Sequence, residues 1–218
     1  MIKQFLTGGD RNLGYLVADE TTRRAAVIDP SYAPETIHDF ARQNNYQIEY
    51  VLNTHDHWDH TNGNDTMKKL CAKAALLFGD TDPTTGIAIA DGARLPLGNL
   101  EIVIIHTPGH THDAICFYIE DAVSNTRAVF TGDTLFVGKV GGTDLGAGAR
   151  AEYESLHHKL LALPGDTRVL PGHNVGVALE STIAGERESN PFLTQPDYES
   201  FVQLKKNWAA YKKEHGID

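Results

Sequence analysis

Short apolar runs recur along the chain, and each is bounded by turn-forming residues. Runs of this kind, rich in β-branched and aromatic side chains, are typical of buried β-strands. The predicted strands are YLVAD, AAVIDP, IEYVLNTH, AICFYIED, RAVFTGDTLF and TRVLPGH. The segment RLPLGNLEIVIIHTPGH predicts a hairpin that turns at Gly98-Asn99.

Apolar residues at a helical spacing separate several of these runs. The predicted helices begin at Pro34, cover about residues 65–74 and 150–163, and include an amphipathic helix at about 197–215. In this last segment Phe201, Leu204, Trp208 and Tyr211 form one apolar stripe, which favours docking against the core. Alternation of strands and helices predicts an α/β fold.

Length and composition indicate one domain that covers residues 1–218. No linker-like composition shift divides the chain, and its 41% hydrophobic and 22% charged residues are ordinary for a globular protein. No apolar stretch approaches the ~18 residues that a membrane span needs, and the N-terminal segment turns polar after Leu6, too soon for a secretory signal. We therefore expect a cytoplasmic protein without a membrane partner.

The charge pattern argues against a nucleic-acid partner. The net charge is −10, and lysines and arginines are scattered apart from pairs near the C-terminus. Cys71 and Cys116 lack C-x-x-C spacing, which favours structural thiols over a disulfide. The oligomeric state is not predicted.

Histidines and aspartates follow several of the predicted strands. They are His55, His57, Asp59 and His60 after IEYVLNT, His110 after IVIIHTPG, Asp133 after AVFTG and His173 after RVLPG. In layered α/β structures, ligands gather in loops beyond the carboxyl ends of strands. We expect these four loops to converge on one edge of the fold.

These side chains can hold two metal ions. His55 and His57 are two residues apart on an extended segment, so they project to the same side and can join His110 around one ion. Asp59, His60 and His173 can hold a second ion, and the two carboxylate oxygens of Asp133 are suited to bridge both. Zinc, iron(II) and manganese accept such nitrogen and oxygen ligands, and two ions about 3.5–4 Å apart can share a water acidified towards neutrality.

A structural role is the alternative for every histidine. We assign it to His38, His106, His157, His158 and His215. His112 is left as a supporting group or a structural one. For the heptad THDHWDH we favour metal binding over a structural role, because clustered aspartates and imidazoles would repel or lie unsatisfied without a cation. Gly109, Gly132 and Gly172 fit a backbone that bends closely around a site.

THDHWDH, with the later TPGHT, FTGDTLF and PGH, resembles the metallo-β-lactamase superfamily. The resemblance implies a four-layer αββα sandwich with a dinuclear centre at one edge. It also implies His55, His57 and His110 at the first metal, Asp59, His60 and His173 at the second, and a bridging Asp133. The better known β-lactamases use a cysteine as a ligand of the second metal. Neither cysteine of this chain stands at that position, so antibiotic hydrolysis is not expected.

Two branches of the superfamily share motifs with the chain. The tryptophan of T-H-x-H-W-D-H and the segment from Ser181 to Phe192 are similar to glyoxalase II, which hydrolyses S-D-lactoylglutathione. Thr143-Asp144 resembles persulfide dioxygenases, which use one iron. Gly142 and Val175 stand where both branches have a basic residue and a tyrosine, and Lys205, Lys206, Lys212 and Lys213 only loosely match the basic C-terminal contacts of glyoxalase II.

The leading hypothesis is a glyoxalase II-like thioester hydrolase that attacks its substrate with a metal-bridging hydroxide. Asp59 and Asp133 would be its catalytic carboxylates, with zinc, or else iron or manganese, as the metal. The partner would be a small thioester or thiol-linked molecule, with glutathione left open. The alternatives are a mononuclear iron persulfide dioxygenase and a catalytically silent metal-binding module.

Overall fold

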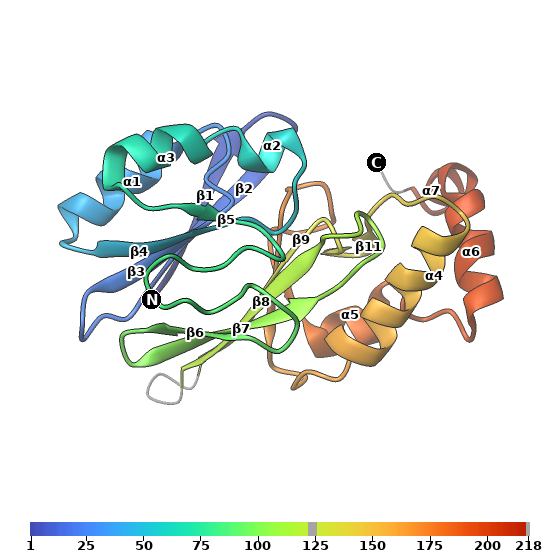
Figure 1. The fold of residues 1–218 in the computed structure, drawn as a ribbon. Helices are drawn as coiled ribbons and strands as arrows, with labels where there is room; N and C mark the ends of the chain where they lie inside the picture. The colour runs from blue at the N-terminus through green and yellow to red at the C-terminus, as the bar shows by residue number, and fades with distance from the viewer. Residues whose placement is uncertain (122–125, 217–218) are drawn as a thin grey trace.

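Two β-sheets lie face to face at the centre of the computed structural model, and helices cover their outer faces (Figure 1). The structure describes residues 1–121 and 126–216. The N-terminal sheet has the order β1 (Ile2–Gly8), β2 (Asn12–Ala18), β3 (Arg24–Ile28), β4 (Gln47–Leu52) and β5 (Ala75–Leu76). The C-terminal sheet has the order β13 (Ser181–Thr182), β12 (Arg168–Pro171), β9 (Thr126–Gly132), β8 (Ile115–Asp121), β7 (Leu100–His106) and β6 (Arg94–Leu97).

The helices form the two outer layers. They are α1 (Pro34–Gln43) and α3 (Asn64–Cys71) on the N-terminal sheet, and α4 (Ala147–Glu154), the π-helical turn η1 (Ser155–Leu160), α5 (Ile183–Ser189) and α6 (Tyr198–Lys206) on the C-terminal sheet. The remaining elements are the one-turn α2 (Trp58–Thr61), the hairpin β10 (Leu135–Phe136) and β11 (Lys139–Val140), and α7 (Trp208–His215).

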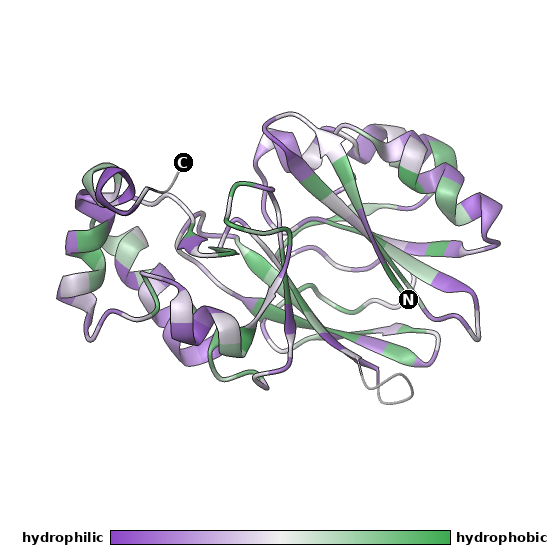
Figure 2. Cartoon of the chain, turned by 180° about the vertical axis from the view of Figure 1, so that it is seen from behind, coloured by the Kyte–Doolittle hydropathy of each residue, from purple (hydrophilic) through white to green (hydrophobic). Residues whose placement is uncertain are grey.

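The alternation of side chains along each strand produces this layering. In β2, Tyr15 and Val17 face the core between the sheets, whereas Leu16 contributes to the cluster shared with Ile37 of α1 and Met67 of α3. Hydrophobic segments accordingly run along the strands of both sheets, while the helices carry mixed colours (Figure 2). The four-layer αββα prediction is therefore confirmed.

The predicted hairpin is present, since β6 pairs with β7 around Gly98, whose φ is 65°. The remaining predicted strands also form, although RAVFTGDTLF is divided into β9 and β10. Strand β1 was not predicted, because its polar residues hide the pattern of a half-exposed edge strand.

Two predicted helices differ in detail from the structure. The segment predicted as one helix over 150–163 is α4 followed by the π-helical η1. The tail predicted as one helix at about 197–215 forms α6 and α7, because the backbone leaves the helical conformation at Asn207, which has φ −104° and ψ 11°. Cys71 and Cys116 are free thiols. Among the described residues, no helix has the length and apolar character that a membrane crossing requires.

Candidate metal centre

Four loops meet at one edge of the sandwich. The first follows β4 and carries the heptad, and the others follow β7, β9 and β12. They bring together all the predicted ligands: His55, His57, Asp59, His60, His110, Asp133 and His173. Their donor atoms form three overlapping groups in which every pair of atoms lies within 4.8 Å.

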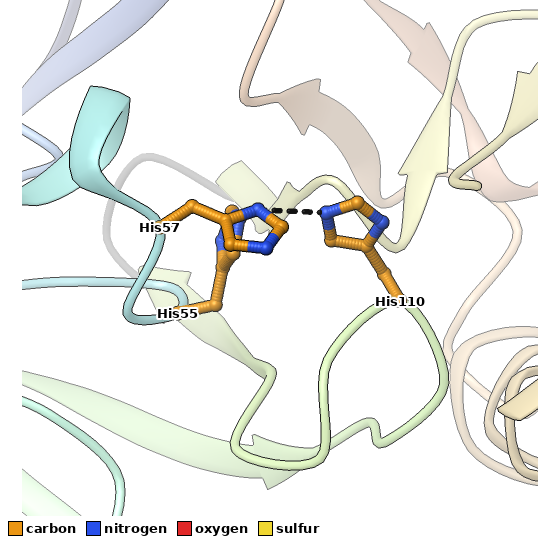
Figure 3. Close-up of side chains that lie close together, drawn as sticks. All are labelled: His55, His57 and His110. Carbon is orange, nitrogen blue, oxygen red and sulfur yellow. Dashed lines mark hydrogen bonds between the residues drawn. The ribbon is translucent and has the colours of Figure 1, made fainter. Parts of the chain in front are cut away.

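The first cluster is built from three imidazoles. His55 Nε2 lies 3.0 Å from His57 Nδ1, which lies 3.1 Å from His110 Nε2. Figure 3 shows the rings converging from two separate loops, with the contact between His57 and His110 dashed. Nitrogens held at ~2.1 Å by one tetrahedral ion would be ~3.4 Å apart, so small movements suffice to bind one.

The second cluster combines a carboxylate with two imidazoles. His60 Nε2 and His173 Nε2 are 3.1 Å apart, and Asp59 Oδ2 lies 3.3 Å from His173 Nε2 and 3.8 Å from His60 Nε2. These separations also suit one cation.

Asp133 lies between the clusters. Its Oδ1 is 3.4 Å from Nε2 of both His60 and His173, whereas its Oδ2 is 3.6 Å from Nε2 of His110. Oδ1 is buried and accepts no hydrogen bond of normal geometry from the described residues. A buried carboxylate oxygen in this state fits a cation ligand.

Hydrogen bonds on the far side of the rings fix their orientation. Nδ1 of His60 donates to Asp29 at 2.9 Å, Nδ1 of His110 to the carbonyl of Gly142 at 2.8 Å, and Nδ1 of His173 to the carbonyl of Asp10 at 2.9 Å. In the neutral ring, each bond places the hydrogen on Nδ1 and leaves Nε2 directed into the cluster. This arrangement is the usual support for metal-bound histidine.

Asp29 and Asn12 are supporting residues that the sequence reasoning missed. Asp29 also accepts bonds from the main chain and hydroxyl of Thr54, at 2.9 and 2.7 Å. Asn12 donates to Asp59 Oδ2 at 3.0 Å. Asp29 directly follows the apolar run AAVI, so the strand-end rule used for the other ligands could have found it.

The histidines assigned structural roles lie outside the three ligand groups. The ring of His112 is exposed, and its carbonyl accepts from His106 Nε2 at 2.8 Å. Gly172 explains the close approach of its loop, since a Cβ there would lie 2.7 Å from Asp133 Oδ1 and 2.8 Å from His60 Cε1.

Comparison with known proteins identifies the family of the chain. Residues 7–173 match the family model of the metallo-beta-lactamase superfamily. The chain belongs to this superfamily.

The chain is also similar to named enzymes and to proteins of solved structure. Over 207 residues the chain is 40% identical to the protein named hydroxyacylglutathione hydrolase cytoplasmic of Arabidopsis thaliana, covering 93% of this chain and 76% of that one. ETHE1 from Myxococcus xanthus superposes with a TM-score of 0.83 at 28% identity, covering 95% of this chain and 91% of that chain. TTHA1623, solved in a di-iron-bound form, has a TM-score of 0.70 at 29% identity, covering 88% and 100%.

The relatives confirm the prediction of a glyoxalase II-like enzyme. Several relatives at 31–40% identity bear the name hydroxyacylglutathione hydrolase. The chain is accordingly a metallo-β-lactamase-fold hydrolase of the metal-dependent, thioester-cleaving type.

Electrostatics favour the metal-binding protonation states of His55, His110 and Asp133. Burial, reinforced by the nearby His60, lowers the pKa of His55 to about 3, and burial likewise lowers the pKa of His110. Both imidazoles are thus neutral and able to bind a cation. Although burial opposes ionisation, the imidazoles of His173 and His60 hold the pKa of Asp133 well below its usual value. Its carboxylate is therefore charged.

Proposed function

We propose that the protein holds two divalent ions and hydrolyses thioesters of an anionic thiol carrier, with glutathione as the leading candidate. The observation that carries this proposal is the position of Asp133. One of its oxygens faces His60 and His173, and the other faces His110. His55, His57 and His110 would hold one ion, and Asp59, His60 and His173 the other.

The ligands present fit zinc, iron(II) or manganese, since all three accept mixed imidazole and carboxylate sets. We propose zinc as the resident metal. The di-iron form of TTHA1623 supports iron as the alternative.

Two ions held by these residues would supply a water of near-neutral pKa and Lewis-acid polarisation of the substrate carbonyl. The chain contributes the geometry and the proton acceptor. Although burial opposes it, the hydrogen bond from Asn12 helps hold the pKa of Asp59 below its usual value, with His60 and His173 acting in the same direction. Asp59 therefore stays ionised, and we assign to its carboxylate the orientation of the attacking water and the acceptance of its proton.

A cavity of about 340 Å³, whose lining includes Val175 two residues after His173, supports an anionic carrier. Its lining comprises Val137, Gly138, Lys139, Val175, Gly176, Val177, Trp208, Lys212 and Gly216. Burial, together with the nearby charge of Lys212, lowers the pKa of Lys139. Two lysines that face one cavity suit carboxylate or phosphate groups.

These lysines offer positive charge where the expected family contacts are missing. A side chain at Gly142 would meet open space, and Val175 lines the cavity without a polar group. The name of the hydroxyacylglutathione hydrolases supports glutathione as the carrier.

The test compares carriers of different charge on zinc-loaded protein. S-lactoylglutathione, a coenzyme A thioester and the neutral N-acetylcysteamine thioester are offered to wild type, Lys139→Met, Lys212→Met and the exposed control Lys69→Met. Loss of either cavity lysine raises KM for the preferred anionic carrier ~10-fold, because a charge-assisted contact contributes ~1.5–3 kcal/mol. The neutral thioester is unaffected. The proposed function is refuted if the zinc-loaded protein hydrolyses none of these thioesters. The anionic subsite is refuted if the lysine variants change KM equally for all carriers.

An iron-dependent dioxygenase is the second candidate, supported by Thr143-Asp144 and the likeness to ETHE1. The Asp144 carboxylate, however, accepts N–H bonds from Gly146 at 2.7 Å and Gly148 at 3.1 Å, which gives it a role at the start of α4. One iron per chain and oxygen uptake that requires glutathione persulfide would select this candidate. Two ions and thioester hydrolysis select the first.

We also propose that residues 1–218 act as one domain in the cytoplasm. The cytoplasmic relative from Arabidopsis thaliana supports that location, although a mitochondrial yeast enzyme is also similar. Fractionation of cells that express a tagged full-length protein tests the location.

A further inference from the structure

The loop that carries His110 is held on its outer side by one helical element. Lys159 Nζ donates to the carbonyl of His106 at 2.6 Å, and Ser155 Oγ donates to the carbonyl of Pro108 at 2.8 Å. Both side chains belong to η1. We infer that Ser155 and Lys159 are positioning residues, which set where His110 stands in the first cluster. This inference rests on the metal centre proposed above.

Helix α4, which precedes η1, packs directly against the main chain of the loop. Gly109 lies directly against Glu152, because a Cβ at Gly109 would be 2.4 Å from the Cβ of Glu152. Its φ of +155° adds a second reason for glycine. Contacts from Glu152, Ser155 and Lys159 thus follow the main chain from residue 109 back to residue 106.

Lys159 also closes a polar ring at the start of the loop. Its Nζ lies 2.9 Å from Asp91 Oδ2, and Asp91 Oδ1 accepts from the main-chain N–H of His106 at 2.7 Å. One lysine and one aspartate therefore satisfy both main-chain groups of His106.

The side chain of His106 connects the start of the loop to its end. The His106 ring stacks on Phe78 at 4.1 Å and bonds the carbonyl of His112 at 2.8 Å. The loop is fixed on both sides of His110, while the carbonyl of Gly142 sets the rotation of the His110 ring.

The π-helical geometry of η1 is a further indication that this element has a functional role. The N–H of Leu161 bonds the carbonyl of Leu156 at 2.9 Å, five residues back. Such turns cost helical stability and occur often near functional sites. Here the turn contains both groups that bond the loop.

Groups that hydrogen-bond a metal ligand directly change metal affinity by ~10–100-fold. Ser155 and Lys159 act one step further out, through the main chain of the loop, so we expect an effect at the low end of that range. The test is a stepwise Co²⁺ titration of the metal-free full-length protein, followed by absorbance. His110→Ala identifies the step that belongs to the first cluster. Ser155→Ala and Lys159→Met weaken that step ~10-fold and leave the other step unchanged, whereas Lys159→Arg restores most of the affinity.

Matched controls separate positioning from general damage. Ser189→Ala removes a hydroxyl that bonds the carbonyl of Gly185 at 2.8 Å on α5, and Lys69→Met removes an exposed lysine of α3. Neither changes the titration. Ser155→Ala deletes one oxygen and keeps the inference testable if a lysine variant misfolds.

The inference is overturned if both steps weaken equally, if neither changes, or if Lys159→Arg behaves like Lys159→Met. A wild type that takes up no Co²⁺ would overturn the metal centre and this inference with it. Because the readout is ion binding, failure of thioester hydrolysis alone leaves the result interpretable.

Discussion

Nδ1 of His60 lies 2.9 Å from Oδ2 of Asp29, and both side chains are almost fully buried, with 1% and 2% exposed. Although burial opposes it, the Asp29 carboxylate helps raise the pKa of His60 well above its usual value. The bond directs Nε2 to the second cluster, and a cation that binds Nε2 there would displace its proton while Asp29 keeps the hydrogen on Nδ1.

Asp29→Asn keeps the size of the side chain but removes its charge. We expect the affinity of the second cluster for zinc to fall ~10–100-fold, because the ring loses its charged partner. Zinc titration against a chelator measures this change. Equal weakening of the first cluster would contradict the separate role of Asp29.

Asp133→Ala removes the carboxylate shared by both clusters. Hydrolysis of the preferred thioester should fall ~100-fold or more, and bound metal should drop below two ions per chain. Metal analysis and steady-state kinetics on the same preparation check both effects. Near-normal turnover by this variant would exclude the proposed mechanism.

Gly172→Ala tests the space between the ligands. The new methyl group would press on Asp133 Oδ1 and His60 Cε1, at 2.7 and 2.8 Å, so we expect lower metal content and ~10-fold or greater loss of activity. Gly142→Ala is the matched control, because its Cβ would have no neighbour within 4 Å and the main-chain carbonyl that bonds His110 is kept. Similar behaviour of the two variants would show that the space at Gly172 is not needed.

Glu152→Gln tests the pH dependence of stability. Burial, only partly opposed by Lys205, raises the pKa of Glu152 from 4.5 to about 7. The stabilising contribution of the protonated group is therefore fully present below pH 4.5 and lost as the pH rises towards 7.

Relative to Glu152→Gln, wild type should lose up to ~3 kcal/mol of unfolding free energy across this range. Urea unfolding of the metal-free proteins at several pH values measures the difference. A constant difference across the range would contradict the raised pKa.

Much of the candidate centre could be predicted because its ligands follow apolar strands. That signal is local, and the order of strands along the chain is enough to suggest convergence. Asn12 gave no such signal, since its contact with Asp59 joins residues far apart in the sequence and asparagine is common in turns.

The fold details that escaped prediction have similar causes. The apolar spacing from Phe201 through Trp208 continues across the break at Asn207, so periodicity alone cannot reveal that two helices are present. The apolar period also continues from α4 into η1, although Leu161 bonds five residues back. Apolar periodicity predicts which side chains are buried, but it does not determine which main-chain groups are hydrogen-bonded to each other.

Each cluster draws its members from both sheets. His55 and His57 follow β4 of the N-terminal sheet, whereas His110 follows β7 of the C-terminal sheet, and the second cluster is divided in the same way. Neither half alone presents a complete coordination set, so tight capture of an ion must wait until the halves have docked. With ions bound as proposed, each cluster would link the two sheets, and loss of the metal would loosen the sandwich first at the edge that carries the clusters.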